Sequence, residues 1–262
     1  MVGSRRRADS KLLASHQRSF LWGRHLVLET LQAGRWPIIE LYLAEDIDGE
    51  SLRAVERATA GRLAIRRATR KRLTELCRAS EHQGFLIQVG AYPYVTLEAL
   101  LERAGAAPLL LVLDGVQDPF NLGAMLRSAE VFGVTGVILA EAGQAGVNSL
   151  AARASAGAVN RLAICRVEAL PAALAELRDR KISVIGTHMS APKGIEDCDL
   201  AKPCALVIGN EGAGLAPETL ALCDRLAKIP QSGGLNSLNA AAAAAVCLYE
   251  AQRQRGFAAG QS

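Results

Sequence analysis

Asn121 and Arg127 are polar residues of types that can hold a phosphate or handle a hydroxyl proton. They lie within residues 113–129, and their spacing of six puts them less than two helical turns apart, without stacking one directly above the other. A guanidinium suits bidentate binding of a phosphate. The plainer alternatives are a surface ion pair for Arg127 and a helix cap for Asn121.

A second polar element follows an apolar run at residues 206–215 and contains the Gly-rich loop GNEGAG. Gly209 has no side chain, so backbone there can approach a ligand closely. Glu211 can accept or orient a proton, or can act as a capping carboxylate beside Gly212. The glycine spacing differs from the G-x-G-x-x-G dinucleotide fingerprint, and the Lys-Ser/Thr of a P-loop is missing. Hydride transfer and nucleotide hydrolysis are therefore disfavoured.

The third element, residues 229–239, ends an apolar run at Pro230 and passes through two glycines to Ser237 and Asn239. The alanines at 240–245 predict a helix, because Ala has the highest helix propensity. Asn236 or Ser237 is expected to cap it. Loop and helix start together suit a polar ligand. Taken alone, the stretch favours a capped core helix after a turn.

Strands and helices alternate along the chain, which predicts an α/β fold. In the second half this alternation indicates a parallel sheet covered by helices on both faces. Strands are expected at 109–113, 136–140, 162–167, 182–187, 204–208 and 226–229, and helices at 121–132, 171–180, 217–223 and 237–252.

Four segments are predicted: a basic flexible arm at 1–19, an α/β domain at 20–92, a linker at 93–107 and a larger domain at 108–262. The linker includes a helix near 96–104. Within 20–92, strands are expected at 37–44, 63–65 and 82–89, a turn and a helix within 20–34, and further helices at 50–60 and 69–77. The arm could instead be a transit peptide, since it is rich in Arg and Ser and poor in acids.

The positive charge is concentrated in the first third of the chain. Residues 1–82 carry 16 Lys and Arg against 10 Asp and Glu, whereas residues 83–262 carry 14 against 16. This imbalance indicates a polyanion partner, and solvated helix faces are the alternative. The clustered cations that would contact this polyanion are Arg66, Arg67, Arg70, Lys71 and Arg72.

Cysteine and histidine usage argues against a metal site. The six cysteines form no CxxC pair, and the four histidines are scattered. The cysteines lie mostly in apolar runs, as expected for buried thiols in a reducing compartment. No apolar run reaches the length of a membrane span without a charge or glycine. We therefore expect a cytoplasmic protein with no metal and no membrane partner.

Residues 113–129, 206–215 and 229–239 resemble, in order and spacing, the three signature motifs of the SPOUT superfamily. The closest similarity is to its TrmH-type RNA ribose 2′-O-methyltransferases, over about residues 108–255. Residues 20–95 are more weakly similar to the substrate-binding domain of a subgroup that methylates a guanosine in large-subunit (23S) ribosomal RNA. That domain resembles a ribosomal protein. The resemblance implies a C-terminal trefoil knot, a homodimer and S-adenosylmethionine as cofactor.

The resemblance also assigns roles to residues that match the motifs. Asn121, Arg127, Glu211, Ser237 and Asn239 match the catalytic positions. The family's arginine has been proposed as the base for the 2′-OH, but an arginine is effectively always protonated, so Glu211 is an alternative acceptor. Backbone groups at the cofactor positions would hold S-adenosylmethionine. The cofactor positions are Gly209, Ile229 and Leu238, with Gly186 and Thr187 as neighbours, and a further family element matches Ser155 and Gly157.

Two departures from the family pattern and two alternative functions remain. Gln231 stands where the family usually has Met, and Phe120 where it often has His. Neither change removes a proposed catalytic group. A transfer-RNA substrate is the alternative within the same chemistry. A non-catalytic RNA-binding or ribosome-assembly protein is the alternative of another class.

Overall fold

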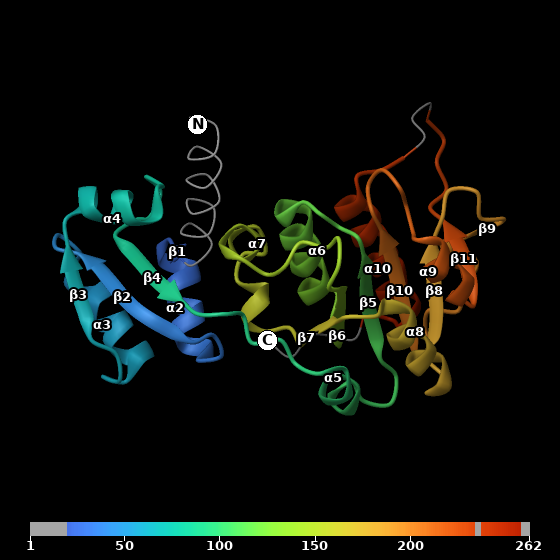
Figure 1. The fold of residues 1–262 in the computed structure, drawn as a ribbon, viewed down its shortest axis with the longest axis horizontal. Helices are drawn as coiled ribbons and strands as arrows, with labels where there is room; N and C mark the ends of the chain where they lie inside the picture. Colours follow the sequence, from blue (N-terminus) through green and yellow to red (C-terminus); the bar gives the residue numbers. More distant parts are fainter. Residues whose placement is uncertain (1–19, 234–236, 258–262) are drawn as a thin grey trace, which may run out of the picture. The chain divides into compact units, whose positions relative to one another are not determined.

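The computed structural model describes residues 20–233 and 237–257. By contacts the chain divides into two compact units (Figure 1). The first unit ends at Pro93 and also takes in Val147–Asn160. The second comprises Tyr94–Gly146 and the chain from Arg161 onward. The basic arm at 1–19 and the candidate cap Asn236 lie outside the described residues.

The first unit is built on a four-stranded mixed sheet in the order β1-β4-β2-β3. Strand β4 pairs antiparallel with β1 and β2, and β2 pairs parallel with β3. Helices α2, α3 and α4 complete the α/β arrangement. The strands are β1 (Phe20–Trp22), β2 (Ile38–Ala44), β3 (Ile65–Ala68) and β4 (Phe85–Val89), and the helices are α2 (Arg24–Ala33), α3 (Gly49–Thr59) and α4 (Arg70–Cys77).

Two strands of this unit begin later than predicted. Strand β4 starts at Phe85 because Gln83 and Gly84 adopt positive φ angles of 54° and 83°, which form a turn. Strand β3 starts at Ile65 and runs into Arg66 and Arg67, so two of the predicted RNA-binding cations lie on a strand. Strand β1 stands where only a turn and a helix were expected.

A segment that sequence periodicity did not reveal belongs to the first unit. It contains α7 (Ser149–Ala154) and the short 3-10 helix η1 (Ala158–Asn160). Asn148 caps α7 by accepting from Leu150 N and Ala151 N, both at 3.0 Å. The helix has only six residues, too few for a periodic apolar pattern to stand out.

The second unit contains a seven-stranded sheet in the order β7-β6-β5-β10-β8-β11-β9. Every pairing within it is parallel, as predicted. The strands are β5 (Leu109–Asp114), β6 (Gly136–Ala140), β7 (Ile164–Val167), β8 (Ser183–Thr187), β9 (Lys193–Gly194), β10 (Cys204–Gly209) and β11 (Arg225–Lys228).

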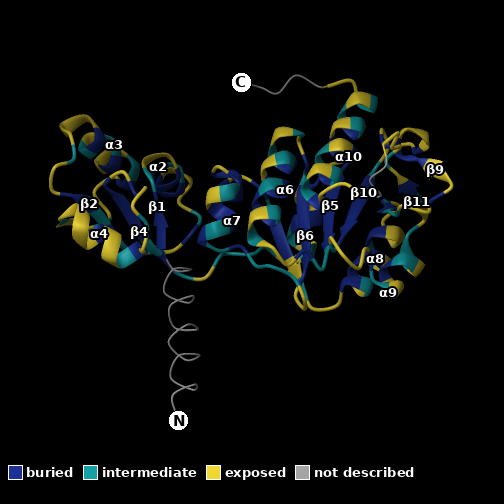
Figure 2. Ribbon diagram, turned by 90° about the horizontal axis from the view of Figure 1, so that it is seen from above, coloured by how far each residue is buried: buried dark blue, intermediate teal, exposed yellow. Residues whose placement is uncertain are grey.

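Helices cover both faces of this sheet, which explains its nearly continuous burial (Figure 2). Leu100, Leu170 and Leu174 pack on one face against alternate strand residues such as Val112 and Val207. Helices α6 and α10 pack together, and α10 also contacts β10. The helices are α5 (Leu97–Arg103), α6 (Pro119–Val131), α8 (Leu170–Asp179), α9 (Pro217–Leu222) and α10 (Ala240–Gln254), with the 3-10 helix η2 (Ile195–Asp197).

Two predicted helix starts are wrong by a few residues because other side chains cap them. Helix α6 begins at Pro119, since Asp118 Oδ1 accepts from Phe120 N at 3.0 Å. Asn121 is therefore inside the helix and does not cap it. Helix α10 begins at Ala240 and is capped by Asn239, so Ser237 is neither its cap nor part of it.

The cysteines are buried thiols, with Cys223 half-buried. Burial raises the pKa of Cys165 to about 11 and that of Cys247 to about 12, so both stay protonated at neutral pH. Among the described residues, no three His, Cys, Asp or Glu side chains gather as a metal cluster. Within the same residues, no helix is long and apolar enough to span a bilayer.

Candidate active site

A cavity of about 780 Å³ lies in the second unit at the carboxyl ends of β8, β10 and β11. Ligands of open α/β sheets characteristically bind at this edge. Three loops form its walls: the one after β8, the GNEGAG loop after β10, and the one after β11. Described residues that line it include Thr187, His188, Met189, Ile208, Gly209, Glu211, Ala213, Lys228, Ile229, Gln231, Ser237, Leu238 and Ala243.

Three of the predicted catalytic residues are joined by hydrogen bonds. Asn239 Oδ1 accepts from Ala241 N at 2.9 Å and from Ala242 N at 3.2 Å. Asn239 Nδ2 donates to Asn121 Oδ1 at 3.1 Å, and Asn121 Nδ2 donates to Glu211 Oε1 at 2.6 Å. The start of α10 thus fixes the orientation of both amides. This series of hydrogen bonds ends at the exposed carboxylate of Glu211, which lines the cavity.

This amide chain has a definite direction. Because the helix N–H groups engage the Asn239 oxygen, only its NH₂ group is left for Asn121. Asn121 must accept with its own oxygen and present its NH₂ group to Glu211. Glu211 Oε2 makes no hydrogen bond to the described residues, so it can accept a further hydrogen bond at the cavity. The arrangement orients Glu211 as a hydrogen-bond acceptor.

The GNEGAG loop is held closed by Asn210, which the sequence reading did not select. Its Oδ1 accepts from Gly212 N at 2.9 Å and Ala213 N at 3.0 Å, and its Nδ2 donates to Gly115 O at 2.8 Å. Asn210 and Gly214 also exchange backbone hydrogen bonds at 2.9 and 3.0 Å. The sequence signal that could have indicated a role for Asn210 is the general preference of Asn for turns.

Gly209 is required for a different reason from the one inferred from sequence. A Cβ atom there would lie 2.3 Å from the carbonyl carbon of Gly214 and 2.6 Å from the nitrogen of Leu215. The absence of a side chain at Gly209 lets the backbone of Gly214 and Leu215, in the same loop, approach closely. Gly209 still lines the cavity, so its backbone remains accessible to a ligand.

The other predicted cofactor residues differ in their positions. Thr187, Ile229 and Leu238 line the cavity, and Leu238 is 44% exposed. Thr187 Oγ1 donates to Val207 O at 3.1 Å, which ties β8 to β10. Gly186 is buried outside the lining, and a Cβ there would lie 2.6 Å from Cys223 Sγ.

Arg127 and Ser237 lie outside the amide chain. Arg127 is exposed on α6, about 9 Å further along the helix axis than Asn121. It is not part of the described cavity lining, and its guanidinium makes no ion pair with the described residues. Ser237 lines the cavity and is exposed.

The predicted RNA-binding cations of the first unit are exposed, but most are paired. Their partners are mainly acidic side chains of the same unit. Arg70 donates to Asp46 at 2.7 Å and thereby holds the pKa of that carboxyl below its usual value. The other pairs are Arg66 with Glu40 at 2.9 Å, Arg67 with Glu45 O at 2.7 Å, and Arg72 with Glu75 at 3.2 Å. Lys71 has no ion-pair partner among the described residues.

The start of α2 and the turn before β4 meet within the first unit. Gln83 Oε1 accepts from Arg24 N at 2.9 Å at the start of α2, and Gly23 N donates to Phe85 O at 3.2 Å. His82 is buried and contacts Thr74 Oγ1 at 3.1 Å. Burial lowers the pKa of His82, so its ring is neutral at physiological pH. His82 and Gln83 therefore have structural roles in the first unit.

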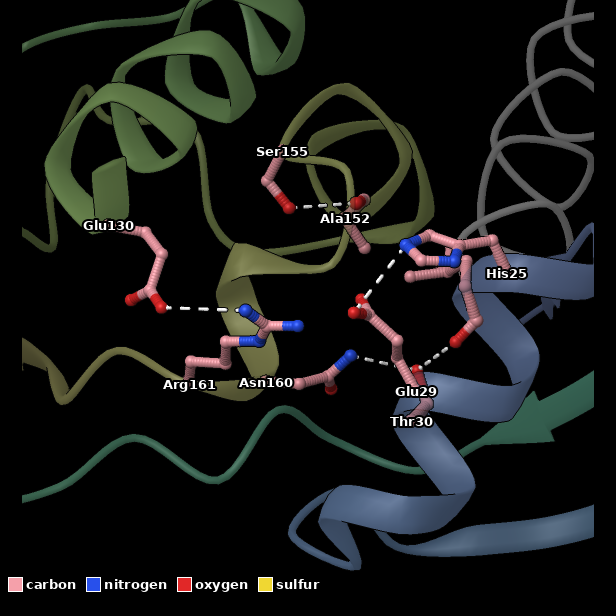
Figure 3. A network of polar contacts seen from close by, with 9 residues as sticks. His25, Glu29, Thr30, Glu130, Ala152, Ser155, Asn160 and Arg161 are labelled. Carbon is pink, nitrogen blue, oxygen red and sulfur yellow. Dashed lines mark hydrogen bonds and ion pairs between the residues drawn. The ribbon is translucent and has the colours of Figure 1, made fainter. Parts of the chain in front are cut away.

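Ser155 and Gly157 also have structural roles within the first unit, and Figure 3 shows the contact of Ser155 with Ala152. Ser155 is buried and donates to Ala152 O at 2.8 Å. Gly157 has φ of 89°, and a Cβ there would lie 1.6 Å from Glu29 Oε2. Nearby, Asn160 Nδ2 donates to Thr30 Oγ1 at 3.1 Å. These contacts attach Val147–Asn160 to α2.

The cavity suits S-adenosylmethionine in size and in chemistry. Small-molecule pockets commonly span about 300–1,000 Å³, and this one falls within that range. Ile208, Ile229 and Leu238 offer apolar surface for an adenine ring. Glu211 and Lys228 supply charges of both signs, as a cationic and zwitterionic ligand requires.

Family models match most of the chain. Residues 108–249 match the SpoU rRNA methylase family, and residues 20–95 match the RNA 2′-O ribose methyltransferase substrate-binding family. A 23S rRNA (guanosine-2′-O-)-methyltransferase of Coxiella burnetii is 37% identical over 90% of this chain and 95% of its own length. The corresponding protein of Neisseria meningitidis is 35% identical over 90% and 95%.

Solved structures of the same family share the fold over nearly the whole chain. The SpoU methyltransferase AviRb of Streptomyces viridochromogenes, in complex with S-adenosylmethionine, matches with a TM-score of 0.78 and 27% identity, covering 91% of this chain and 90% of its own. An S-adenosylmethionine-bound rRNA methyltransferase of Sinorhizobium meliloti matches with a TM-score of 0.76 and 28% identity, covering 89% and 86%. The chain therefore belongs to the SpoU rRNA methylase family and is an S-adenosylmethionine-dependent RNA 2′-O-methyltransferase.

Proposed function

We propose that the chain methylates the ribose 2′-OH of a guanosine in 23S ribosomal RNA, in the cytoplasm. The observation that carries this proposal is the extent of the match to relatives named for that reaction, which covers 90% of the chain and so includes the first unit. A TrmH/SpoU tRNA modifying enzyme of A. aeolicus is 30% identical, and the match covers only 62% of this chain. A tRNA substrate is accordingly the second candidate.

The cofactor is assigned to the cavity at β8, β10 and β11. S-adenosylmethionine supplies a methyl group on a sulfonium that is itself the leaving group. Backbone groups at Gly209, Ile229 and Leu238 would hold the adenosyl part, with Thr187 beside them. Gly186 supports this wall by packing behind it. The protein's remaining tasks are to align the acceptor hydroxyl and to exclude water.

Glu211 is the group that we assign to the 2′-OH proton. Asn121 and Asn239 position it through the amide chain, and its Oε2 atom is directed to no other described group. Ser237 would contact the substrate from the cavity edge. We assign Arg127 to a phosphate of the RNA, because a guanidinium that stays protonated is a poor base and a good bidentate donor. These intact groups argue against a non-catalytic binding protein.

The first unit is assigned to RNA capture. The proposed segments of the chain are a basic arm at 1–19, a binding domain at 20–92, a linker at 93–107 and a methyltransferase domain at 108–262. Lys71 and Arg24 are exposed and form no ion pair with the described residues, so they are freer to meet phosphates than Arg66, Arg67, Arg70 or Arg72. The paired arginines would have to exchange partners on binding. The family's ribosomal-protein-like fold for this domain agrees with its small mixed sheet.

A homodimer is proposed through α6 and α10. Exposed apolar side chains gather on these helices: Phe120 and Val131 on α6, and Val246 and Tyr249 on α10, each 40–70% exposed. Tyr249 contacts Phe132 and Phe257 at ring-centroid distances of 6.2 and 5.4 Å. Apolar side chains gathered on one element of a monomer indicate a protein interface.

The trefoil knot is proposed from the family and from the strand order. Strand β10 lies between β5 and β8, which precede it by long connections. Arg255, just after α10, donates to Leu200 O at 2.8 Å and to Ala107 O at 2.8 Å. The end of the C-terminal helix is thus tied to the segments that lead into β5 and β10.

The substrate assignment is tested by mapping 2′-O-methyl marks in ribosomal and transfer RNA from cells with and without the gene. We expect one guanosine mark in 23S rRNA to disappear on deletion and to return with the wild-type gene. A mark lost from tRNA alone would support the second candidate. Unchanged marks in both RNAs would refute the proposal.

A further inference from the structure

Lys228 is the one fixed positive charge among the described residues that line the cavity. It is exposed at the last position of β11, next to Ile229, and makes no ion pair with the described residues. Among the same described residues, the only carboxylate is that of Glu211, which is already hydrogen-bonded to Asn121. Neither the family motifs nor the sequence analysis selected Lys228.

The backbone beneath Lys228 is firmly fixed. Strand β11 pairs in parallel with β8 on one side and with β9 on the other, and Lys228 is in register with Gly194. Ala227 is fully buried, and its carbonyl accepts from His188 N at 2.9 Å. A flexible four-carbon stem therefore carries a compact cation from a rigid edge of the cavity.

We propose that Lys228 binds the carboxylate of the methionine part of S-adenosylmethionine. This inference rests on the cofactor site proposed above. The ligand carries one anionic group, and that group requires a partner when it leaves water. Glu211 repels it, so the carboxylate is expected on the β11 side of the cavity.

His188 is the other lining side chain that could donate to the carboxylate. Its Nδ1 accepts from Ser190 N at 3.3 Å, which leaves Nε2 as the ring atom that can donate. A neutral donor provides a weaker bond to a carboxylate than an ammonium does. His188 is therefore a useful comparison variant for Lys228.

The test is calorimetric titration of the full chain with two ligands, S-adenosylmethionine and 5′-methylthioadenosine. The second ligand lacks the amino-acid group and its carboxylate. For Lys228→Met we expect roughly five- to tenfold weaker binding of S-adenosylmethionine, the range for one charge-assisted contact at a partly exposed site. Binding of 5′-methylthioadenosine should be unchanged. Lys228→Arg should retain most of the affinity.

Lys193→Met is the matched control. Lys193 is an exposed lysine on the neighbouring strand β9, paired in register with Ala227, and it does not line the cavity. Its substitution should change the affinity for neither ligand. His188→Gln should reduce S-adenosylmethionine binding less than Lys228→Met does. Equal melting temperatures of the variants would verify that each is folded.

Three outcomes would overturn the proposal. In the first, both ligands lose affinity equally, which would mean that Lys228 supports the adenosine site or the fold. In the second, Lys228→Met binds S-adenosylmethionine as the wild type does. In the third, only RNA affinity falls, which would assign Lys228 to a phosphate. Failure of the wild-type chain to bind either ligand would instead refute the cofactor site itself.

Discussion

At the scale of single residues, the structure shows which atoms of Asn121, Glu211 and Asn239 donate and which accept hydrogen bonds. Asn121, Glu211 and Asn239 could be selected from the sequence, because they lie in motifs with a recognisable order. Their hydrogen bonds could not, since residues 90 to 118 positions apart meet only in the fold. The start of α10 determines which atom each amide presents. Catalysis is therefore expected to depend on the cap of a helix.

Asn239→Ser separates the capping role from the positioning role. Serine caps a helix about as well as asparagine, but it has no NH₂ group to donate to Asn121. We expect stability within about 0.5 kcal/mol of wild type and a methyl-transfer rate at least roughly tenfold lower. Asn239→Ala should lose activity and also about 0.5–2 kcal/mol of stability. Thermal unfolding and initial rates measure both effects, and a fully active Asn239→Ser variant would remove the positioning role.

Arg127→Ala should nearly abolish methylation while S-adenosylmethionine affinity changes little. The reason is position, because Arg127 lies outside the described cavity lining and has no described ion-pair partner. Arg127→Lys should also fail if bidentate phosphate geometry matters, because lysine is a point charge. Calorimetry and steady-state kinetics with RNA check both variants. Normal turnover of Arg127→Ala would show that the residue is dispensable, and normal turnover of Arg127→Lys would show that bidentate geometry is not needed.

At the scale of elements, the long periodic segments were predictable and the short ones were not. The parallel sheet could be expected from regular alternation, whereas α7 has six residues and β9 only two. Helix starts were shifted because the actual caps are Asp118 and Asn239. The GNEGAG loop could be selected from the sequence and lines the cavity, but the close approach of Gly214 to Gly209 is visible only in the fold.

Gly209→Ala is expected to damage the loop before any ligand is present. Its Cβ would overlap the backbone of Gly214, so the loop must shift, at a cost of about 1–3 kcal/mol. Both melting temperature and cofactor affinity should fall. Gly212→Ala is the control, because a Cβ there meets only Asn210 Oδ1 at 3.5 Å. Equal stability of the two variants would contradict the loop geometry.

At the scale of the whole molecule, the methyltransferase part of the sequence and the second compact unit are not identical. The family match at 108–249 includes Val147–Asn160, which pack with the first unit. This could not be predicted, because the segment lies in the middle of the larger sequence region. Each unit is therefore made of two separate stretches of the chain, so a truncation between residues 93 and 108 would remove only part of the first unit.

A fragment that starts near Ala107 is expected to lose stability. Removal of the first strands and helices would uncover a set of side chains that are at most 8% exposed in the full chain. They are Val147, Ala151, Ala152, Ala158 and Val159. Hydrogen exchange should show residues 147–160 unprotected in the fragment and protected in the full chain. Equal protection would contradict the division into units.

Tyr249→Glu should convert the proposed dimer to a monomer. Tyr249 is 51% exposed on α10, and a charge at the centre of an apolar interface is costly to desolvate. Ile39→Glu is the control, because Ile39 is 59% exposed on β2 of the first unit. Light scattering should report a dimer for the wild type and for the control. A wild-type monomer would refute the dimer, and an unchanged Tyr249→Glu dimer would refute this interface.

The central claim is that this chain transfers a methyl group from S-adenosylmethionine to a ribose 2′-OH of ribosomal RNA through the Glu211 site. Its most direct test is incubation of the purified protein with labelled S-adenosylmethionine and unmodified 23S rRNA, followed by nuclease digestion and mass spectrometry. The account predicts 2′-O-methylguanosine at one position with the wild type, and none with Glu211→Gln, which should still bind the cofactor. Methylation of a base, or undiminished 2′-O-methylation by Glu211→Gln, would contradict it.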